Sequence, residues 1–241
     1  MPQHILSTIK GGVTALLDVL YPPVCLGCGT RIIAGDVLCA QCLAGLPALP
    51  VTAERSLEHI QSLTFPAEAR MMLVGFEHES GGVLEACIHA MKYQSMQSVA
   101  RWLGRLLGEQ LHGSAMLEGD PLLLPVPLHR IKQIERGYNQ SALLCEGLSE
   151  ETGLEVREDI LLRRRYTLSQ AAARLHREER RNNMLEAFTV NESALAALRD
   201  RPMIIVDDLV TTGATMGECA AALYEHGVRD IRFLALARPR G

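Results

Sequence analysis

Two neighbouring carboxylates stand directly before a turn of small residues in the last third of the chain. Asp207 and Asp208 follow the apolar run 203–206. After Leu209 and Val210, the turn consists of Thr211, Thr212, Gly213, Ala214 and Thr215. Small residues let successive backbone N–H groups point into one cavity, and a helix that follows directs its free N–H groups there too. The turn is therefore typical of phosphate binding, and the carboxylates suit sugar hydroxyls or hydrated Mg²⁺.

A second polar segment follows the apolar run 122–126. Pro125 and Pro127 stiffen the chain there and favour an unusual peptide geometry. The basic residues of the segment are Arg130, Lys132 and Arg136. Asn139 is a suitable N-cap for a helix, so cations and free backbone N–H groups would lie together, as a departing pyrophosphate requires. The alternative is an exposed loop whose basic residues are only solvated.

Four cysteines form two closely spaced pairs near the N-terminus. They are Cys25, Cys28, Cys39 and Cys42. Four thiolates at this spacing suit tetrahedral Zn²⁺ in a closed structural site, which leaves no position for a catalytic water. Redox dithiols, disulfides and a 4Fe–4S cluster are the alternatives. Because the chain has seven cysteines and no recognisable secretory signal, the pattern favours a metal and a cytoplasmic location.

The segment 157–183 is rich in arginine and only weakly periodic. One interpretation is a loop that closes over a polyanionic substrate and excludes water. A solvated helix face with local ion pairs is the second. A surface for single-stranded nucleic acid is the third, although only Tyr166 offers a stacking ring nearby. The net charge of -4 gives the whole chain no attraction to polyanions.

The elements that must position these groups alternate along the chain. Apolar runs predict strands at 71–76, 122–126, 203–206 and 231–237. Helical periodicity predicts helices at 83–93, 98–112, 139–151, 193–199 and 215–226. We interpret 51–68 as a linker or an irregular entry. The alternation predicts an α/β fold with a parallel sheet covered on both faces, and the Cys-rich segment before it is small enough to need a metal.

The arrangement as a whole resembles the competence-associated ComF family, which is similar to type I phosphoribosyltransferases. The matching marks are the paired cysteines, Met91-Lys92-Tyr93, Pro125-Val126-Pro127-Leu128, Arg136-Gly137-Tyr138-Asn139-Gln140, the turn at 207–215, Gln170, Arg180-Arg181-Asn182-Asn183 and Ala187-Phe188. The chain departs from the family at Gln133 and Ile134, where relatives tend to be more basic.

The resemblance implies a parallel-sheet phosphoribosyltransferase domain at 51–241, with a capping subdomain at 70–112. Residues 1–50 would form a short helix and a zinc-ribbon module. The expected ligand is 5-phosphoribosyl-1-pyrophosphate (PRPP). Asp207 and Asp208 would bind its ribose hydroxyls, and 211–215 its 5′-phosphate. Arg136 would stabilise the pyrophosphate, and Arg130 and Lys92 are further candidates for contacting PRPP.

The function that follows is transfer of phosphoribosyl from PRPP to a nitrogen acceptor, with Mg²⁺ bound and pyrophosphate released. The resemblance also implies a link to DNA uptake in natural competence. The alternative is a non-catalytic PRPP-sensing or single-stranded-DNA-handling protein. Its zinc module would then face partners such as a competence helicase or channel protein. No apolar run is long enough to span a membrane. The acceptor base and the oligomeric state are not specified by the sequence.

Overall fold

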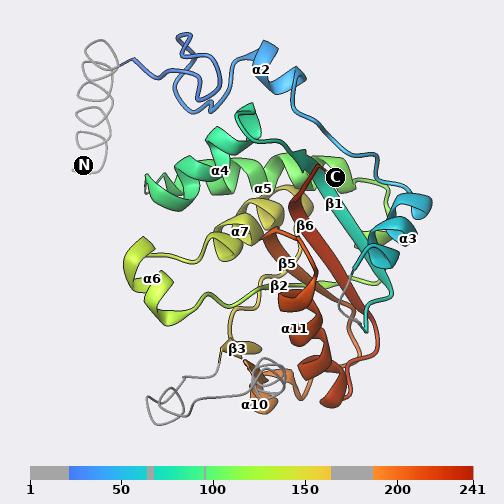
Figure 1. The fold of residues 1–241 in the computed structure, drawn as a ribbon. Coiled ribbons are helices and arrows are strands. Elements are labelled where there is room, and N and C mark those ends of the chain that lie inside the picture. Colours follow the sequence, from blue (N-terminus) through green and yellow to red (C-terminus); the bar gives the residue numbers. More distant parts are fainter. Residues whose placement is uncertain (1–21, 64–67, 95, 164–186, 241) are drawn as a thin grey trace, which may run out of the picture.

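A four-stranded parallel sheet forms the centre of the molecule. The computed structural model describes residues 22–63, 68–94, 96–163 and 187–240. Within them the strand order is β1 (Met71–His78), β6 (Ile231–Pro239), β5 (Met203–Leu209) and β2 (Leu122–Pro125), and every pairing is parallel (Figure 1). The strands are almost continuously apolar because helices cover both faces of the sheet.

The two faces of the sheet carry separate hydrophobic clusters. Helices α4 (Val83–Tyr93), α5 (Gln97–Leu111) and α7 (Gln140–Thr152) lie together over one face, as Figure 1 shows. The other face packs against α11 (Ala214–Glu225), α3 (Ala53–Gln61) and a two-stranded antiparallel sheet of β3 (Leu161–Arg163) and β4 (Phe188–Val190). Alternate residues of one strand therefore serve different clusters: Leu73 belongs to the first, Met72 and Val74 to the second.

Helices α5 and α7 touch backbone to backbone. A Cβ atom at Gly104 would lie 2.3 Å from the Leu144 carbonyl oxygen, and one at Gly147 would lie 2.0 Å from the Arg101 carbonyl oxygen. Only glycine fits at both positions, since real side chains do not approach a backbone so closely. The close packing fixes α7, whose first turn lies at the carboxyl edge of the sheet.

The cysteine-rich module is joined to the edge of the main sheet. Residues 47–49 run antiparallel to β1, with Leu49 N donating to Gly75 O at 2.8 Å and Glu77 N donating to Pro47 O at 2.9 Å. The module itself contains a bridge between Val24 and Arg31 and the short helix α2 (Ala40–Ala44). The helix expected before it falls within residues 1–21, outside the described part of the chain.

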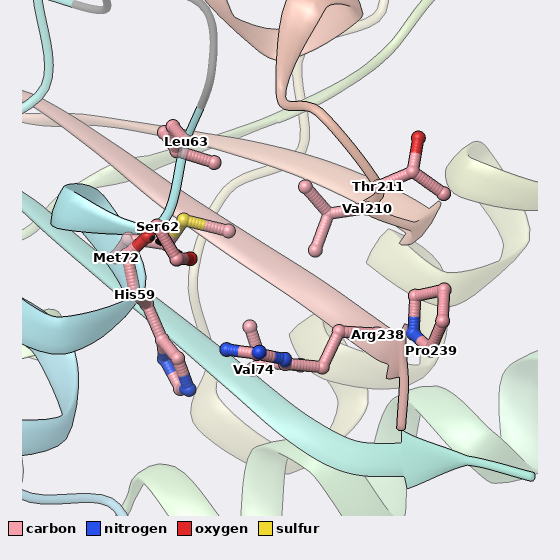
Figure 2. Close-up of a pocket in the computed structure, with 9 residues that line it drawn as sticks. All are labelled: His59, Ser62, Leu63, Met72, Val74, Val210, Thr211, Arg238 and Pro239. Atoms are coloured by element: carbon pink, nitrogen blue, oxygen red, sulfur yellow. Dashed lines mark hydrogen bonds between the residues drawn. The ribbon is translucent and has the colours of Figure 1, made fainter. Parts of the chain in front are cut away.

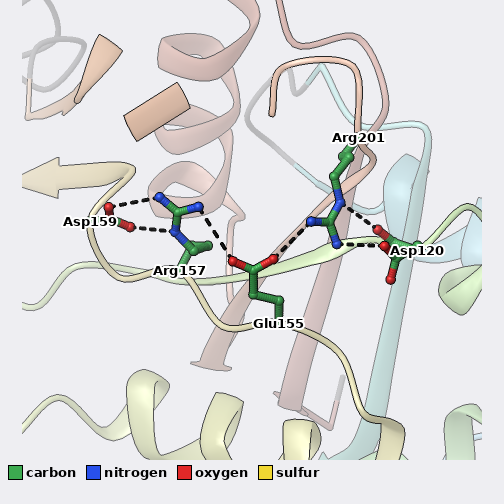
Figure 3. Close-up of polar contacts among 5 residues, drawn as sticks. All are labelled: Asp120, Glu155, Arg157, Asp159 and Arg201. Atoms are coloured by element: carbon green, nitrogen blue, oxygen red, sulfur yellow. Dashed lines mark hydrogen bonds and ion pairs between the residues drawn. The ribbon is translucent and has the colours of Figure 1, made fainter. Parts of the chain in front are cut away.

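A set of ion pairs connects the loops at the edge of the sheet where strands β2 and β5 begin (Figure 3). Arg201 lies 2.9 Å from both Glu155 and Asp120, and Arg157 lies 2.8 Å from Asp159. The pairs join the segments that lead into β2 and β5. Because the carboxylates of these pairs are exposed, each pair adds little stability, and their main effect is to locate the loops.

Most predicted elements are present, and the α/β fold with a parallel sheet is confirmed. The main correction is α3, which lies in the segment predicted to be a linker. Thr52 caps this helix by accepting from Arg55 N at 3.2 Å. The inward residues of α3 include Ser56 and His59, so its buried face lacks the apolar period that reveals most helices.

Three further details differ from the sequence-based expectations. The segment after β2 is a helix, α6 (Arg130–Arg136), instead of a loop, and β5 and β6 continue beyond their predicted ends. The second sheet, the 3-10 turn η1 (Ala115–Leu117) and α10 (Glu192–Leu195, predicted as 193–199) are short elements that periodicity resolves poorly. The described residues contain no cis peptide bond, so the unusual geometry expected near Pro125 and Pro127 is absent there.

Candidate functional site: the carboxyl edge of the sheet

The turn between β5 and α11 has the shape of a phosphate-binding loop. Gly213 is the N-cap of α11 and has a left-handed backbone, with φ 79°. A Cβ atom there would lie 2.6 Å from Leu63 Cδ2, so glycine is required by both conformation and space. The side chains of Thr211, Thr212 and Thr215 are exposed. The hydroxyls and the positive end of α11 therefore face the same solvent region.

The two carboxylates lie just inside this turn and are held by other elements. Asp207 Oδ1 accepts from the Ser141 hydroxyl at 3.1 Å and from the Asp208 amide at 2.9 Å. Asp208 Oδ2 lies 2.6 Å from Lys92 Nζ and accepts from Gln140 Nε2 at 3.4 Å. The Lys92 and Asp208 side chains are only 15% and 9% exposed. The acidic pair is therefore oriented by the end of α4 and the start of α7.

Burial makes one of the carboxylates a weak acid. Loss of solvent and the neighbouring Asp208 charge raise the pKa of Asp207 to about 7, against the opposing effects of the Asp208 amide, Ser141 and Lys92. Lys92 contacts only Asp208 directly. The pair thus carries less negative charge near neutral pH than two free carboxylates, and a ligand that donates hydrogen bonds or positive charge would restore ionisation.

The run from Gly137 to Gln140 joins β2, α4 and α7 at this edge. Gly137 ends α6 in a left-handed conformation, with φ 80°. The Tyr138 hydroxyl donates to the Met91 carbonyl, next to Lys92. Asn139 caps α7 by accepting from Ser141 N at 3.1 Å and donates to Val126 O at 3.0 Å. Tyr138 and Asn139 thus fix the chain beside Lys92 and Ser141, which contact the acidic pair, and Gln140 contacts the pair directly.

The basic residues predicted for the second loop are only partly brought together. The Arg136 guanidinium lies 5.5 Å from the centre of the Tyr93 ring, next to Lys92 in sequence. Lys132 is exposed on α6, and the side chain of Arg130 lies outside the described part of the structure. Lys92, a candidate for contacting PRPP, has its ammonium against Asp208, and a contact with PRPP stays a prediction.

The described start of the arginine-rich segment lies beside the same loop. Arg163, the last residue of β3, donates to Pro127 O at 3.5 Å and lies 5.1 Å from the centre of the Phe188 ring. Residues 164–186 lie outside the described residues, and they include Gln170 and the Arg180-Arg181-Asn182-Asn183 run. Closure of this segment over a substrate therefore stays a prediction.

Sequence reasoning missed Ser141 and Gln140 as groups that contact the carboxylates. Both stand in the first turn of α7, and Gln140 is 5% exposed with its Oε1 buried and unpaired. A signal was present: two polar residues directly after an N-cap, on a helix that otherwise faces the core. Their role depends on the sheet order, because β2 and β5 must be neighbours before α7 can reach Asp207 and Asp208.

The four paired cysteines converge on one point. The sulfur atoms of Cys25, Cys28, Cys39 and Cys42 lie within 4.8 Å of one another, and Cys28 and Cys39 are 3.7 Å apart. A tetrahedron with Zn–S bonds of about 2.3 Å has sulfur separations of about 3.8 Å. The observed geometry therefore fits a zinc ion. No other cluster of potential metal ligands occurs among the described residues.

Local backbone groups favour a thiolate at Cys25, whereas burial and hydrogen bonds with the neighbouring sulfurs raise the pKa of Cys42 to about 12. Burial opposes ionisation of Cys25, but hydrogen bonds from the backbone of Cys39, Cys28 and Gly27 lower its pKa to about 6. A Cβ atom at Gly27 would lie 2.9 Å from Cys42 Sγ, so glycine leaves space for the sulfur. Such a cluster suits a structural metal, because all its ligand positions are filled by protein. The remaining cysteines are buried elsewhere, at Cys87, Cys145 and Cys219.

Comparison with known proteins identifies both parts of the chain. Residues 16–53 match the double zinc ribbon domain family, and residues 160–241 match the phosphoribosyl transferase domain family. Although the family matched by residues 16–53 is named for a double ribbon, the chain supplies cysteines for one four-sulfur cluster. Within the described residues no helix has the length and apolar character needed to cross a bilayer.

Three curated relatives cover different shares of the chain. Competence protein F of Haemophilus influenzae is 29% identical over 229 residues, which cover 89% of this chain and 96% of the relative. DNA utilization protein YhgH of Escherichia coli O157:H7 is 32% identical over 222 residues, or 89% of this chain and 90% of the relative. Competence protein ComFC of Streptococcus pneumoniae is 30% identical over 113 residues, or 47% and 46%.

Proposed function

Because this chain belongs to the ComF/YhgH family, which combines a zinc ribbon with a phosphoribosyltransferase domain, we propose that it binds PRPP and transfers its phosphoribosyl group to a nitrogen acceptor. The observation that carries the proposal is the placement of a turn suited to phosphate shortly after two carboxylates, of which Asp207 is partly buried and Asp208 is buried. In the proposed division, residues 51–241 perform this function and residues 1–50 contain the zinc module.

The threonines of the turn and the carboxylates before it suit the two ends of a sugar phosphate. Thr211, Thr212 and Thr215 are exposed, and α11 directs free N–H groups toward them, so this side suits the 5′-phosphate. Asp207 and Asp208 lie deeper, where ribose hydroxyls can donate to carboxylate oxygens. The Gly213 conformation and the Ala214 backbone keep the turn open to the phosphate.

The leaving pyrophosphate would lie toward the segment after β2. Arg136 and the exposed Lys132 are on α6, Arg163 contacts the Pro127 carbonyl, and α7 begins at Gln140. These groups place positive charge and a helix N-terminus on one side of the acidic pair. Lys92 is 2.6 Å from Asp208, and Arg136 lies over the ring of the next residue, Tyr93, so we expect the ammonium to turn toward the pyrophosphate when PRPP binds.

The oxygen atoms at this edge fit Mg²⁺. Asp207, Asp208 and the Ser141 hydroxyl would hold the ion directly or through water, since Mg²⁺ selects oxygen ligands. When bound with PRPP, Mg²⁺ supplies neutralisation of the pyrophosphate charge. The chain's own contribution is to orient the ribose through the carboxylates and to hold the phosphate through the turn. The same carboxylates stabilise the positive charge that develops on the sugar as pyrophosphate departs.

A pyrophosphate-release assay tests this function. The chain is mixed with PRPP, Mg²⁺ and a panel of nitrogen heterocycles, and released pyrophosphate is measured. Activity with at least one acceptor is expected for the wild type, and Asp208→Asn should lower it by about 100-fold or more, because one ribose contact and the Lys92 partner are lost. Equal rates in the two proteins would contradict the assigned roles.

The ion pair between Lys92 and Asp208 favours a second candidate function. It occupies a carboxylate oxygen that a ribose hydroxyl would use, so PRPP binding would break the pair and move the end of α4. A non-catalytic PRPP-sensing protein could use that movement. Tight PRPP binding with no pyrophosphate release for any acceptor would favour this candidate.

The names of the relatives suggest where either function operates. One relative is named for competence and another for DNA utilization. We place the chain's action in the cytoplasm, where thiolates stay reduced, in connection with DNA uptake. The zinc module is the proposed surface for a helicase or channel partner, and contact with single-stranded DNA would show as salt-sensitive affinity.

A further inference from the structure

A separate pocket opens beside the phosphate-binding turn (Figure 2). Its volume is about 220 Å³. The apolar part of its wall comes from Leu63, Met72, Val74 and Val210, and Thr211 of the turn forms part of its rim. The polar part comes from His59 and Ser62 of the α3 region and from Arg238 near the end of β6. We call this space the α3 pocket. None of its polar groups except Thr211 has a role in the PRPP site.

His59, one of the residues that line the α3 pocket, carries an unsatisfied polar atom. His59 is 2% exposed, and its Nδ1 is buried without a hydrogen-bond partner. Burial and the neighbouring Arg238 charge lower the pKa of His59, so the imidazole is neutral at pH 7. Buried side-chain atoms without a partner are rare in native proteins. The Arg238 side chain extends from β6 toward His59, which brings a guanidinium to the same pocket (Figure 2).

The strand order places the pocket opposite the proposed pyrophosphate site. In the proposed site pyrophosphate would leave over β2 and ribose would lie over the end of β5. The residues that line the pocket come from β1, from β6 and from the segment after β5. A nucleophile that displaces a leaving group from a sugar carbon approaches the opposite face of the ring. Strands β6 and β1 lie on the other side of β5 from β2. The acceptor should therefore arrive from the side of β6 and β1, where the α3 pocket lies.

We propose that the α3 pocket binds the nitrogen acceptor, and that the acceptor is a planar heterocycle with a carbonyl oxygen beside a ring N–H on one edge. This inference rests on the proposed phosphoribosyl transfer. Arg238 offers only donors and would bind the carbonyl oxygen, while Nδ1 of the neutral His59 would accept from the N–H. The apolar wall would cover the faces of the ring. Hydroxypurines and oxopyrimidines carry such an edge.

The transfer step is balanced with this orientation. The polar edge points inward, and a ring nitrogen on the opposite edge faces the sugar past Thr211. The bond from the sugar carbon to the pyrophosphate oxygen breaks with its electron pair on oxygen. A new bond forms from that carbon to the ring nitrogen, and the proton of the nitrogen passes to solvent water on the acceptor side.

Hypoxanthine and uracil are the probes that test the pocket, and unsubstituted purine is the matched probe without the carbonyl. Binding is measured by calorimetry with full-length protein, with and without PRPP and Mg²⁺. The ¹⁵N resonance of His59 Nδ1 is followed in histidine-labelled protein. We expect at least one carbonyl probe to shift this resonance and to bind about tenfold more tightly than purine.

Two arginine variants separate the pocket from general effects of charge. Arg238→Met should lower the affinity for the carbonyl probe about tenfold. Arg240→Met is the matched control, because Arg240 is exposed and pairs with Glu77 and Glu79 outside the pocket. It should leave probe affinity within about twofold. PRPP titration and circular dichroism of each variant establish that the protein is folded.

The outcomes distinguish the pocket from the function on which it rests. If PRPP binds but neither carbonyl probe binds or shifts His59, the acceptor inference is overturned while PRPP binding stands. Equal affinity for purine and the carbonyl probes, or an unchanged affinity in Arg238→Met, also overturns it. If the probes bind as expected but PRPP does not, the pocket assignment stands and the transferase function fails.

Discussion

The ion pair between Lys92 and Asp208 gives the sharpest quantitative prediction. The two charged atoms are 2.6 Å apart, and the side chains are 15% and 9% exposed. Removing one partner of a buried pair costs about 3–5 kcal/mol, because the other charge is left without compensation. Lys92→Met should cost about 3 kcal/mol of unfolding free energy, since it leaves Asp208 beside Asp207 without its cation.

The other two corners of a double-mutant cycle follow from the same geometry. Asp208→Asn leaves a lysine whose stem can carry the ammonium to solvent, so its cost should be about 1–2 kcal/mol. The double variant removes both charges and should lie within about 1–2 kcal/mol of the wild type. The two partners should therefore show a coupling of about 2 kcal/mol or more.

Urea unfolding at pH 8, followed by Trp102 fluorescence and circular dichroism, measures the cycle. Arg105→Met is the control, because it breaks an ion pair with Glu150 whose side chains are 39% and 50% exposed. That variant should cost no more than about 1 kcal/mol. Additive single effects, with a coupling below about 0.5 kcal/mol, would refute the reasoning that the pair is buried and mutually dependent.

Three further predictions concern the turn, the acidic pair and the metal. Gly213→Ala should cost about 2 kcal/mol more in urea unfolding than Gly113→Ala, since both glycines have positive φ but only Gly213 would meet a neighbouring side chain; equal costs would contradict this. Because the folded-state pKa of Asp207 is about 7 and its reference value is 3.8, the folded state holds the extra proton between these values. The contribution of Asp207 to the unfolding free energy should therefore fall, by up to about 4 kcal/mol, as pH rises from 4 to 7, so the wild type should lose stability relative to Asp207→Asn over this range; a constant difference between the two proteins would count against the raised pKa. Plasma mass spectrometry should find one zinc per chain in the wild type and in Cys145→Ala but none in Cys42→Ser, and retention of zinc in Cys42→Ser would exclude the four-sulfur site.

The sequence predicts the sheet well because its strands are buried on both faces. A run such as 203–206 has few structures open to it other than a central strand, and the acidic residues and small turn after it fix its carboxyl end. The cysteine spacing was also informative, since four soft ligands at short intervals favour one shared metal. These features are local, and local patterns can be recognised without knowledge of the tertiary structure.

The parts that escaped prediction depend on contacts between distant segments. The α3 helix turns Ser56 and His59 inward, and Ser56 accepts from the Met72 backbone. Because these buried residues are polar, the sequence of α3 does not indicate a buried helix face. Ser141 reaches Asp207 only because β2 and β5 are neighbours. The partner of Lys92 was likewise hidden, since a lone lysine on an apolar helix face usually extends to solvent. Sheet order, which sets all three contacts, is not encoded in any one segment.

The most direct measurement is a calorimetric titration of the chain with PRPP, with and without Mg²⁺. One molecule of PRPP should bind per chain, more tightly with Mg²⁺ present, and the variant Asp207→Asn with Asp208→Asn should lose affinity by about tenfold or more. A wild-type chain that binds no PRPP, or a double variant that binds it as well as the wild type, would contradict the assignment of this edge of the sheet to PRPP.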